Sequence, residues 1–139
     1  MRNKVLVVDD EPFSVTVMAD ELTEAGYDVL VAYSGEEAIH SALYSAPHII
    51  LLDVVMPDMD GYEVCKMLKN SNATKDIPVV ILTALDDNAS RNKATQAGAD
   101  GFMCKPLNMA ELLTRFNDLL HLNGGGSLPF KSSHSQFVR

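Results

Sequence analysis

The chain of 139 residues has the length of a single domain, and its formal net charge of −8 makes it acidic. This charge disfavours nucleic-acid binding by the chain, because nucleic-acid binders carry a surplus of Lys and Arg. No window approaches the ~18 consecutive apolar residues of a membrane span, so we expect no membrane partner. The first residues have no secretory pattern, and Cys65 and Cys104 have no metal-ligand spacing. We therefore expect a cytoplasmic protein with two reduced thiols.

The first third of the chain alternates predicted strands and helices. Residues 4–9 form a buried strand that ends in acids, and Pro12 suits the first turn of the helix that follows. Asp28–Ala32 is a second strand, and Ser34 with Glu37 has the capping-box spacing of a second helix. The helical spacing predicts two inner faces: Val15, Met18, Leu22 and Ala25 in the first helix, and Ile39, Ala42 and Leu43 in the second.

The middle of the chain carries its most informative stretch, in which four aliphatic residues run directly into Asp53. A continuous apolar run bounded by turn signals predicts a strand buried on both faces, here Ile49–Asp53. Asp58 and Asp60 follow in a loop, and Asp60 is placed to cap a third helix. The predicted inner face of that helix is Val64, Met67 and Leu68.

Two further strand and helix pairs complete the pattern. Residues 77–83 and Gly101–Cys104 read as strands, with Pro78 at a strand start where no ladder donor is lost. Residues 86–96 are helical in pattern but offer the core only Ala89, Ala94 and Ala97. Asn108 and Glu111 open a last helix, whose apolar residues are Leu112, Leu113, Phe116, Leu119 and Leu120.

Strands that alternate with helices predict an α/β fold, a five-stranded parallel sheet with helices on both faces. We assign residues 1–123 to this domain. Residues 124–139 begin Gly-Gly-Gly-Ser without the periodicity of a folded element, which predicts a flexible tail or linker.

Chemically active side chains stand at the ends of four predicted strands: Asp9, Asp10, Asp53, Thr83 and Lys105. The carboxyl ends of parallel strands meet at one edge of the sheet, where ligands bind. Clustered carboxylates repel one another unless a cation lies among them, and Mg²⁺ prefers oxygen ligands. An ammonium and a hydroxyl can neutralise and orient a phosphoryl group. The pattern therefore favours phosphoryl transfer to a carboxylate.

Four motifs carry a resemblance to a known family: Val-Val-Asp9-Asp10-Glu11-Pro, Leu-Leu-Asp53-Val-Val-Met-Pro-Asp-Met-Asp-Gly61, Ile-Leu-Thr83-Ala and Gly-Phe102-Met-Cys-Lys105-Pro106. In order and spacing, the chain from Lys4 to about Leu122 resembles the receiver domain of two-component response regulators. The resemblance implies a flavodoxin-like sheet of strand order 2-1-3-4-5.

The resemblance also implies a role for each site residue. Asp53 would accept a phosphoryl group, and Asp9, Asp10, Asp53 and the backbone carbonyl of Val55 would hold Mg²⁺. Thr83 and Lys105 would contact the phosphoryl oxygens, with a cis Lys105–Pro106 bond. Phosphorylation would draw Thr83 toward the site and let Phe102, the switch aromatic, turn inward.

The partners that the resemblance implies are a histidine kinase or phosphotransfer protein and an output domain or target not visible in this sequence. The chain would catalyse only its own phosphorylation and slow dephosphorylation. A homodimer would form through the face made by the fourth helix, fifth strand and fifth helix.

Three alternatives stay open. A haloacid dehalogenase-type phosphatase would place its nucleophile in a DxD motif after the first strand, where this chain has adjacent Asp9 and Asp10. A flavin or nucleotide binder would need a Gly-rich phosphate loop that is missing here. A receiver-like interaction module that is not regulated by phosphorylation is the third alternative. Asp9 and Asp10 alone could also be an ordinary helix cap, and Cys104 a small buried hydrophobe.

Overall fold

The computed structural model describes the backbone of residues 2–125 and the side chains of residues 2–121. It consists of alternating strands and helices: β1 (Lys4–Val8), α1 (Pro12–Glu24), β2 (Asp28–Ala32), α2 (Gly35–Ser45), β3 (Ile49–Asp53), α3 (Gly61–Lys69), β4 (Val79–Thr83), α4 (Asn88–Ala97), β5 (Gly101–Cys104) and α5 (Met109–Gly125). The strands pair in parallel in the order β2-β1-β3-β4-β5. The predicted fold class and strand order are therefore confirmed.

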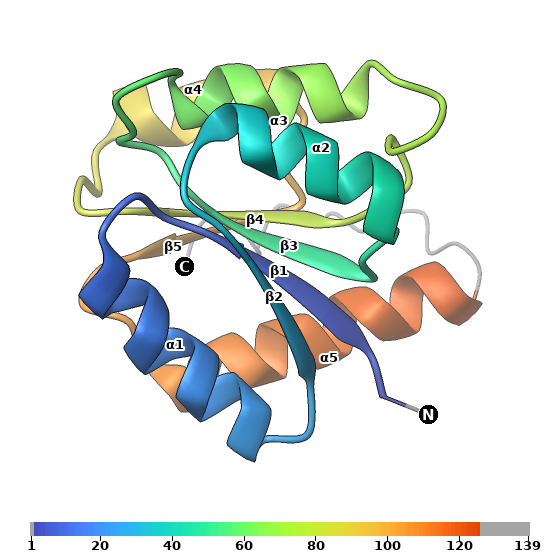
Figure 1. Ribbon diagram of the computed structural model, residues 1–139. Helices are drawn as coiled ribbons and strands as arrows, with labels where there is room; N and C mark the ends of the chain where they lie inside the picture. Colours follow the sequence, from blue (N-terminus) through green and yellow to red (C-terminus); the bar gives the residue numbers. More distant parts are fainter. Residues whose placement is uncertain (1, 126–139) are drawn as a thin grey trace.

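The sheet lies between two helical layers, with α1 and α5 on one face and α2, α3 and α4 on the other (Figure 1). Successive side chains of a strand point to opposite faces, and β1 divides its residues accordingly. Val5 and Val7 pack into the core beneath α1 and α5, whereas Leu6 and Val8 pack into the core beneath the other three helices. The central strands are thus buried on both faces, as their continuous apolar sequences predict.

Side-chain caps fix where the helices begin. Glu11 accepts a hydrogen bond from the Ser14 amide at the start of α1, and Ser34 accepts one from the Glu37 amide at the start of α2. Asp60 caps α3 in the same manner, as predicted. Such caps satisfy amides that have no partner within the helix.

For several residues the predicted place on the inner face is wrong, because each helix is rotated slightly from the predicted orientation. Leu43 and Met67 are 47% and 49% exposed, and Ala25 and Ala89 are also exposed. Their places in the core are taken by smaller neighbours, Ala38 in α2, Cys65 in α3 and Ser90 in α4. The reason is steric: a helix packed closely on a sheet turns its small side chains to the contact, and apolarity alone does not encode that requirement.

Element ends also differ from prediction by one or two residues. β4 begins at Val79 rather than at residue 77, since Pro78 has no amide to donate, although its carbonyl accepts from the Ile50 amide. Helix α5 continues through Gly124 and Gly125, which the sequence assigned to the tail, because a terminal helical turn tolerates glycine. The rest of the predicted tail, residues 126–139, lies outside the described residues.

The expectations for the two cysteines and for membrane-spanning helices can be compared with the described residues. Both cysteines are free, and burial raises the pKa of the Cys65 thiol to about 12. Among residues 2–125, no helix combines the length and the apolar character needed to cross a bilayer.

Candidate functional site

The sheet register brings the predicted site residues to one edge. Asp53 is the last residue of β3 and pairs with Leu82, so Thr83 follows at the end of β4. Asp9 comes directly after β1, and Lys105 directly after β5. All of these positions lie at carboxyl ends of parallel strands.

The three predicted acids form one cluster. Asp9, Asp10 and Asp53 each offer a carboxylate oxygen, and these atoms lie within 4.8 Å of one another. Asp9 is buried, and its Oδ1 accepts a hydrogen bond of 3.0 Å from the Glu11 amide. Its Oδ2 is the one buried side-chain polar atom without a hydrogen-bond partner among residues 2–121. An unpartnered buried carboxylate oxygen beside two further acids fits a hard divalent cation such as Mg²⁺.

Asp53 has a mixed electrostatic environment. Its side chain is nearly buried, and its Oδ1 lies 3.5 Å from the Lys105 ammonium. Burial, followed by the neighbouring Asp9 charge, raises the pKa of the Asp53 carboxyl, while Lys105 and the Val55 amide act in the opposite direction. The ionised carboxylate is therefore held at a free-energy cost that a further positive charge would relieve.

Thr83 is buried beside this cluster and makes a local hydrogen bond. Its Oγ1 accepts from the Leu85 amide at 3.1 Å, so the hydroxyl proton is left for another acceptor. The Thr83 carbonyl accepts from the Lys105 amide at 2.8 Å, which ties the ends of β4 and β5 together. The Lys105–Pro106 peptide bond is cis.

Phe102 is buried in this structure, where the residue is only 4% exposed. Its inward turn after phosphorylation stays a prediction. The Arg91 guanidinium lies 5.4 Å from the ring centroid, and Arg91 Nε donates to Asp86 at 2.8 Å. A cation over the ring face stabilises the inward position, and the sequence pattern gave no indication of this contact.

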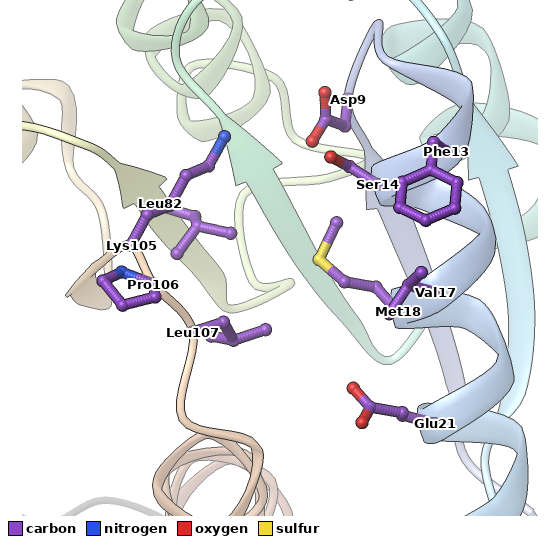
Figure 2. Close-up of a pocket in the computed structure, with 10 residues that line it drawn as sticks. All are labelled: Asp9, Phe13, Ser14, Val17, Met18, Glu21, Leu82, Lys105, Pro106 and Leu107. Carbon is purple, nitrogen blue, oxygen red and sulfur yellow. The ribbon is translucent and has the colours of Figure 1, made fainter.

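A cavity of about 310 Å³ opens beside the acids, between α1 and the segment that follows β5. Figure 2 shows Phe13, Val17 and Met18 on the α1 side, with Lys105 and Leu107 on the other. Phe13 is 74% exposed and Val17 is 42% exposed. The site therefore continues into a largely apolar groove, and no single stretch of sequence encodes that groove because its two walls come from opposite ends of the chain.

Asp58 contacts the start of α2, and the sequence did not indicate this contact. Its carboxylate accepts hydrogen bonds from the amides of Gly35 and Glu36, at the first turn of α2. The only signal in the sequence was an acid in a turn, which does not indicate which helix it will contact.

Comparison with known proteins agrees with this geometry. The family model described as the response regulator receiver domain matches residues 5–117. Response regulator PleD of Caulobacter vibrioides is 41% identical over 119 residues, which cover 86% of this chain and 26% of that protein. The alkaline phosphatase synthesis regulatory protein PhoP of Bacillus subtilis is 40% identical, over 86% of this chain and 49% of its own length.

A solved structure of a receiver protein has the same fold. The chemotaxis response regulator CheY4 of Vibrio cholerae superimposes with a TM-score of 0.80 at 31% identity, covering 86% of this chain and 99% of that one. The chain spans between about a quarter and about half of the length of the two curated relatives. With a matching family model over most of its length, this chain belongs to the response regulator receiver domains of two-component signal transduction.

Proposed function

We propose that this receiver domain takes a phosphoryl group from a phosphohistidine onto Asp53, in a reaction that depends on Mg²⁺. The observation that carries the proposal is the setting of Asp53, a nearly buried carboxylate with one ammonium at 3.5 Å and two further acids within 4.8 Å. Burial and the neighbouring Asp9 charge raise the pKa of the Asp53 carboxyl, and two of its neighbours, Asp9 and Lys105, line the adjacent groove.

In the proposed reaction, a carboxylate oxygen of Asp53 attacks phosphorus and the bond from phosphorus to the histidine nitrogen breaks. The electron pair of that bond stays on the nitrogen, which takes a proton from solvent. Lys105 would attract one phosphoryl oxygen, and Thr83 would donate its hydroxyl proton to another; the Lys105–Asp53 pair and the acceptor role of Thr83 Oγ1 toward the Leu85 amide support these roles. The same groups would support slow hydrolysis of the acyl phosphate by water.

Asp9, Asp10 and Asp53 would hold the cation, joined by the carbonyl of Val55. When bound, Mg²⁺ supplies positive charge that neutralises the acids and the transferring phosphoryl group. The unpartnered Asp9 Oδ2 supports this assignment, because a buried carboxylate oxygen needs a partner.

The groove supports a docking mode for the phosphodonor. An amphipathic helix that carries the phosphohistidine could bury apolar side chains against Phe13 and Val17 while its histidine reaches Asp53. The donor would be a histidine kinase or a phosphotransfer protein in the cytoplasm. Phe13→Ala should then slow transfer from a phosphorylated kinase and leave uptake from a small phosphodonor unchanged.

We assign the output to the face of α4, β5 and α5. Helix α4 offers the core only Ser90, Ala94 and Ala97, so little packing holds it in place. Movement of Thr83 toward a phosphoryl group would pull on Leu85 and Asp86, and through Asp86 on the Arg91 that covers Phe102. The face could bind an output domain, a separate target or a second copy of the chain.

Incubation with phosphoramidate, a small donor with a nitrogen–phosphorus bond, tests the proposal. Intact-mass spectrometry should record one added phosphoryl group in the presence of Mg²⁺ and none after chelation. Steady release of phosphate from simple esters, or uptake indifferent to Mg²⁺, would contradict it.

A further inference from the structure

The loop between β3 and α3 is held at its tip by a side chain outside the predicted site. Asp58 Oδ1 accepts from the Gly35 amide at 3.0 Å, and its Oδ2 accepts from the Glu36 amide at 3.1 Å. The Gly35 amide, followed by the Glu36 amide, lowers the pKa of the Asp58 carboxyl, so it stays charged at neutral pH. A charged carboxylate is favoured at a helix N-terminus.

Steric contacts keep the same two segments together. A Cβ placed on Gly35 would lie 3.0 Å from Met59 Cβ and 2.9 Å from Val64 Cγ2, so the loop packs directly on the first residue of α2. At its base, the loop is closed by a hydrogen bond of 2.9 Å from the Gly61 amide to the Val54 carbonyl. The loop is therefore fixed at its base and again at its tip.

This loop carries the backbone that faces the phosphoacceptor. The Val55 amide lowers the pKa of the Asp53 carboxyl, and the Val55 carbonyl is the backbone ligand expected for the cation. The Val55 side chain is 72% exposed, so its own packing does little to fix the peptide. Its orientation depends on buried Val54 and Met56 on either side and on the held tip of the loop.

We propose that Asp58 is a positioning residue for the phosphoacceptor site, which clamps the loop to the N-terminus of α2 and so holds the Val55 peptide in place for the cation and for Asp53. Groups that orient metal ligands change metal affinity without touching the metal. The inference rests on the proposed Mg²⁺ site and adds to it Asp58, which follows Asp53 by five positions.

Asp58→Ala, Asp58→Asn and Ser34→Ala separate positioning from simple helix capping. Ser34 accepts from the Glu37 amide at the same helix end and makes no described hydrogen bond to the loop, so Ser34→Ala is the matched control. Titration with Mg²⁺ alone, followed by NMR shifts of amides around Asp53, gives the dissociation constant of each variant. Hydrogen exchange without Mg²⁺ reports the clamp itself.

We expect Asp58→Ala to weaken Mg²⁺ binding by about 10-fold and to speed amide exchange at Gly35, Glu36 and Val55. Asp58→Asn, which keeps one acceptor oxygen, should fall between Asp58→Ala and the parent. Ser34→Ala should lower thermal stability and leave the Mg²⁺ dissociation constant within about twofold of the parent, since the loop is untouched.

Two results are diagnostic. If both Asp58 variants bind Mg²⁺ as tightly as the parent, Asp58 is only a helix cap and the inference is wrong, while the proposed function stands. If the parent itself does not bind Mg²⁺, the proposed function fails first and the positioning role fails with it.

Discussion

Replacing Asp53, the proposed phosphoacceptor, should make the metal-free domain more stable. Asp53→Asn removes a charge that is nearly buried and lies within 4.8 Å of the oxygens of Asp9 and Asp10. Asparagine has almost the same shape, so packing at the end of β3 is retained. The variant loses the attraction to Lys105, and the sign of the effect depends on which interaction is larger.

Coulomb's law gives the magnitude. At the upper limit of 4.8 Å for their separation, repulsion between Asp53 and buried Asp9 is about 3.5 kcal/mol at an effective dielectric constant of about 20. The Lys105 pair at 3.5 Å would be about 4.7 kcal/mol at that constant but only about 1.2 kcal/mol in water. Because the Lys105 side chain is 37% exposed, solvent screening lowers its attraction well below the larger figure, and the attraction does not exceed the repulsion from Asp9.

Two further terms destabilise the parent relative to the variant: the cost of burying the charged Asp53 carboxylate and the weaker repulsion from exposed Asp10. We therefore expect Asp53→Asn to stabilise the fold by about 1–2 kcal/mol, which corresponds to a rise in melting temperature of about 3–8 °C. Calorimetry in chelator measures this, with Asp20→Asn as a control that removes the same charge from an exposed position.

The pH dependence has a definite sign. The pKa of Asp53 is raised in the folded chain above its ordinary value of 3.8, so between these two values the folded chain binds more protons than the unfolded chain. Stability of the parent relative to Asp53→Asn therefore falls as pH rises through that window and recovers in acid. A variant no more stable than the parent in chelator at neutral pH would refute the reasoning.

Three further predictions concern the metal, the lifetime of the phosphoryl group and the switch. Asp10→Ala should raise the Mg²⁺ concentration for half-maximal phosphorylation by at least about 10-fold; an unchanged titration would remove Asp10 from the ligand set. The family resemblance implies that the side chains two positions after Asp53 and two after Thr83 flank the path of the attacking water. Here these are Val55 and Leu85, which are 72% and 60% exposed and apolar, so neither can orient that water. Val55→Asn with Leu85→Glu should speed phosphate loss by about one to two decades, and equal decay curves would exclude these side chains as determinants. Arg91→Ala should uncover Phe102 and lower the free energy of unfolding by about 1 kcal/mol; a urea midpoint equal to that of the parent would show that Arg91 does not hold the ring.

Most of the architecture could be predicted from the sequence because local signals agree with one another. The aliphatic run before Asp53 marked a strand buried on both faces, and Asp60 marked the start of α3. The rotation of the helices could not be predicted in detail. Whether Ala38 rather than Leu43, or Cys65 rather than Met67, faces the core depends on how closely the helix approaches the sheet.

The residues of the site could be predicted for a similar reason, since they lie at or directly after the carboxyl ends of strands. Contacts that bridge separate segments were not readable. The Asp58 clamp joins the loop after β3 to α2, and the Arg91 contact joins α4 to β5. Each depends on a tertiary approach for which a single sequence carries no local signal.

Chemical mapping of the phosphorylated residue tests the central claim most directly. Borohydride reduces an aspartyl phosphate to homoserine, which marks the modified position permanently. After treatment with phosphoramidate and Mg²⁺, peptide mass spectrometry should find homoserine at position 53 in the parent and at no position in Asp53→Asn. Homoserine at another aspartate of the parent, or unmodified Asp53 in a protein that has gained a phosphoryl group, would contradict the account.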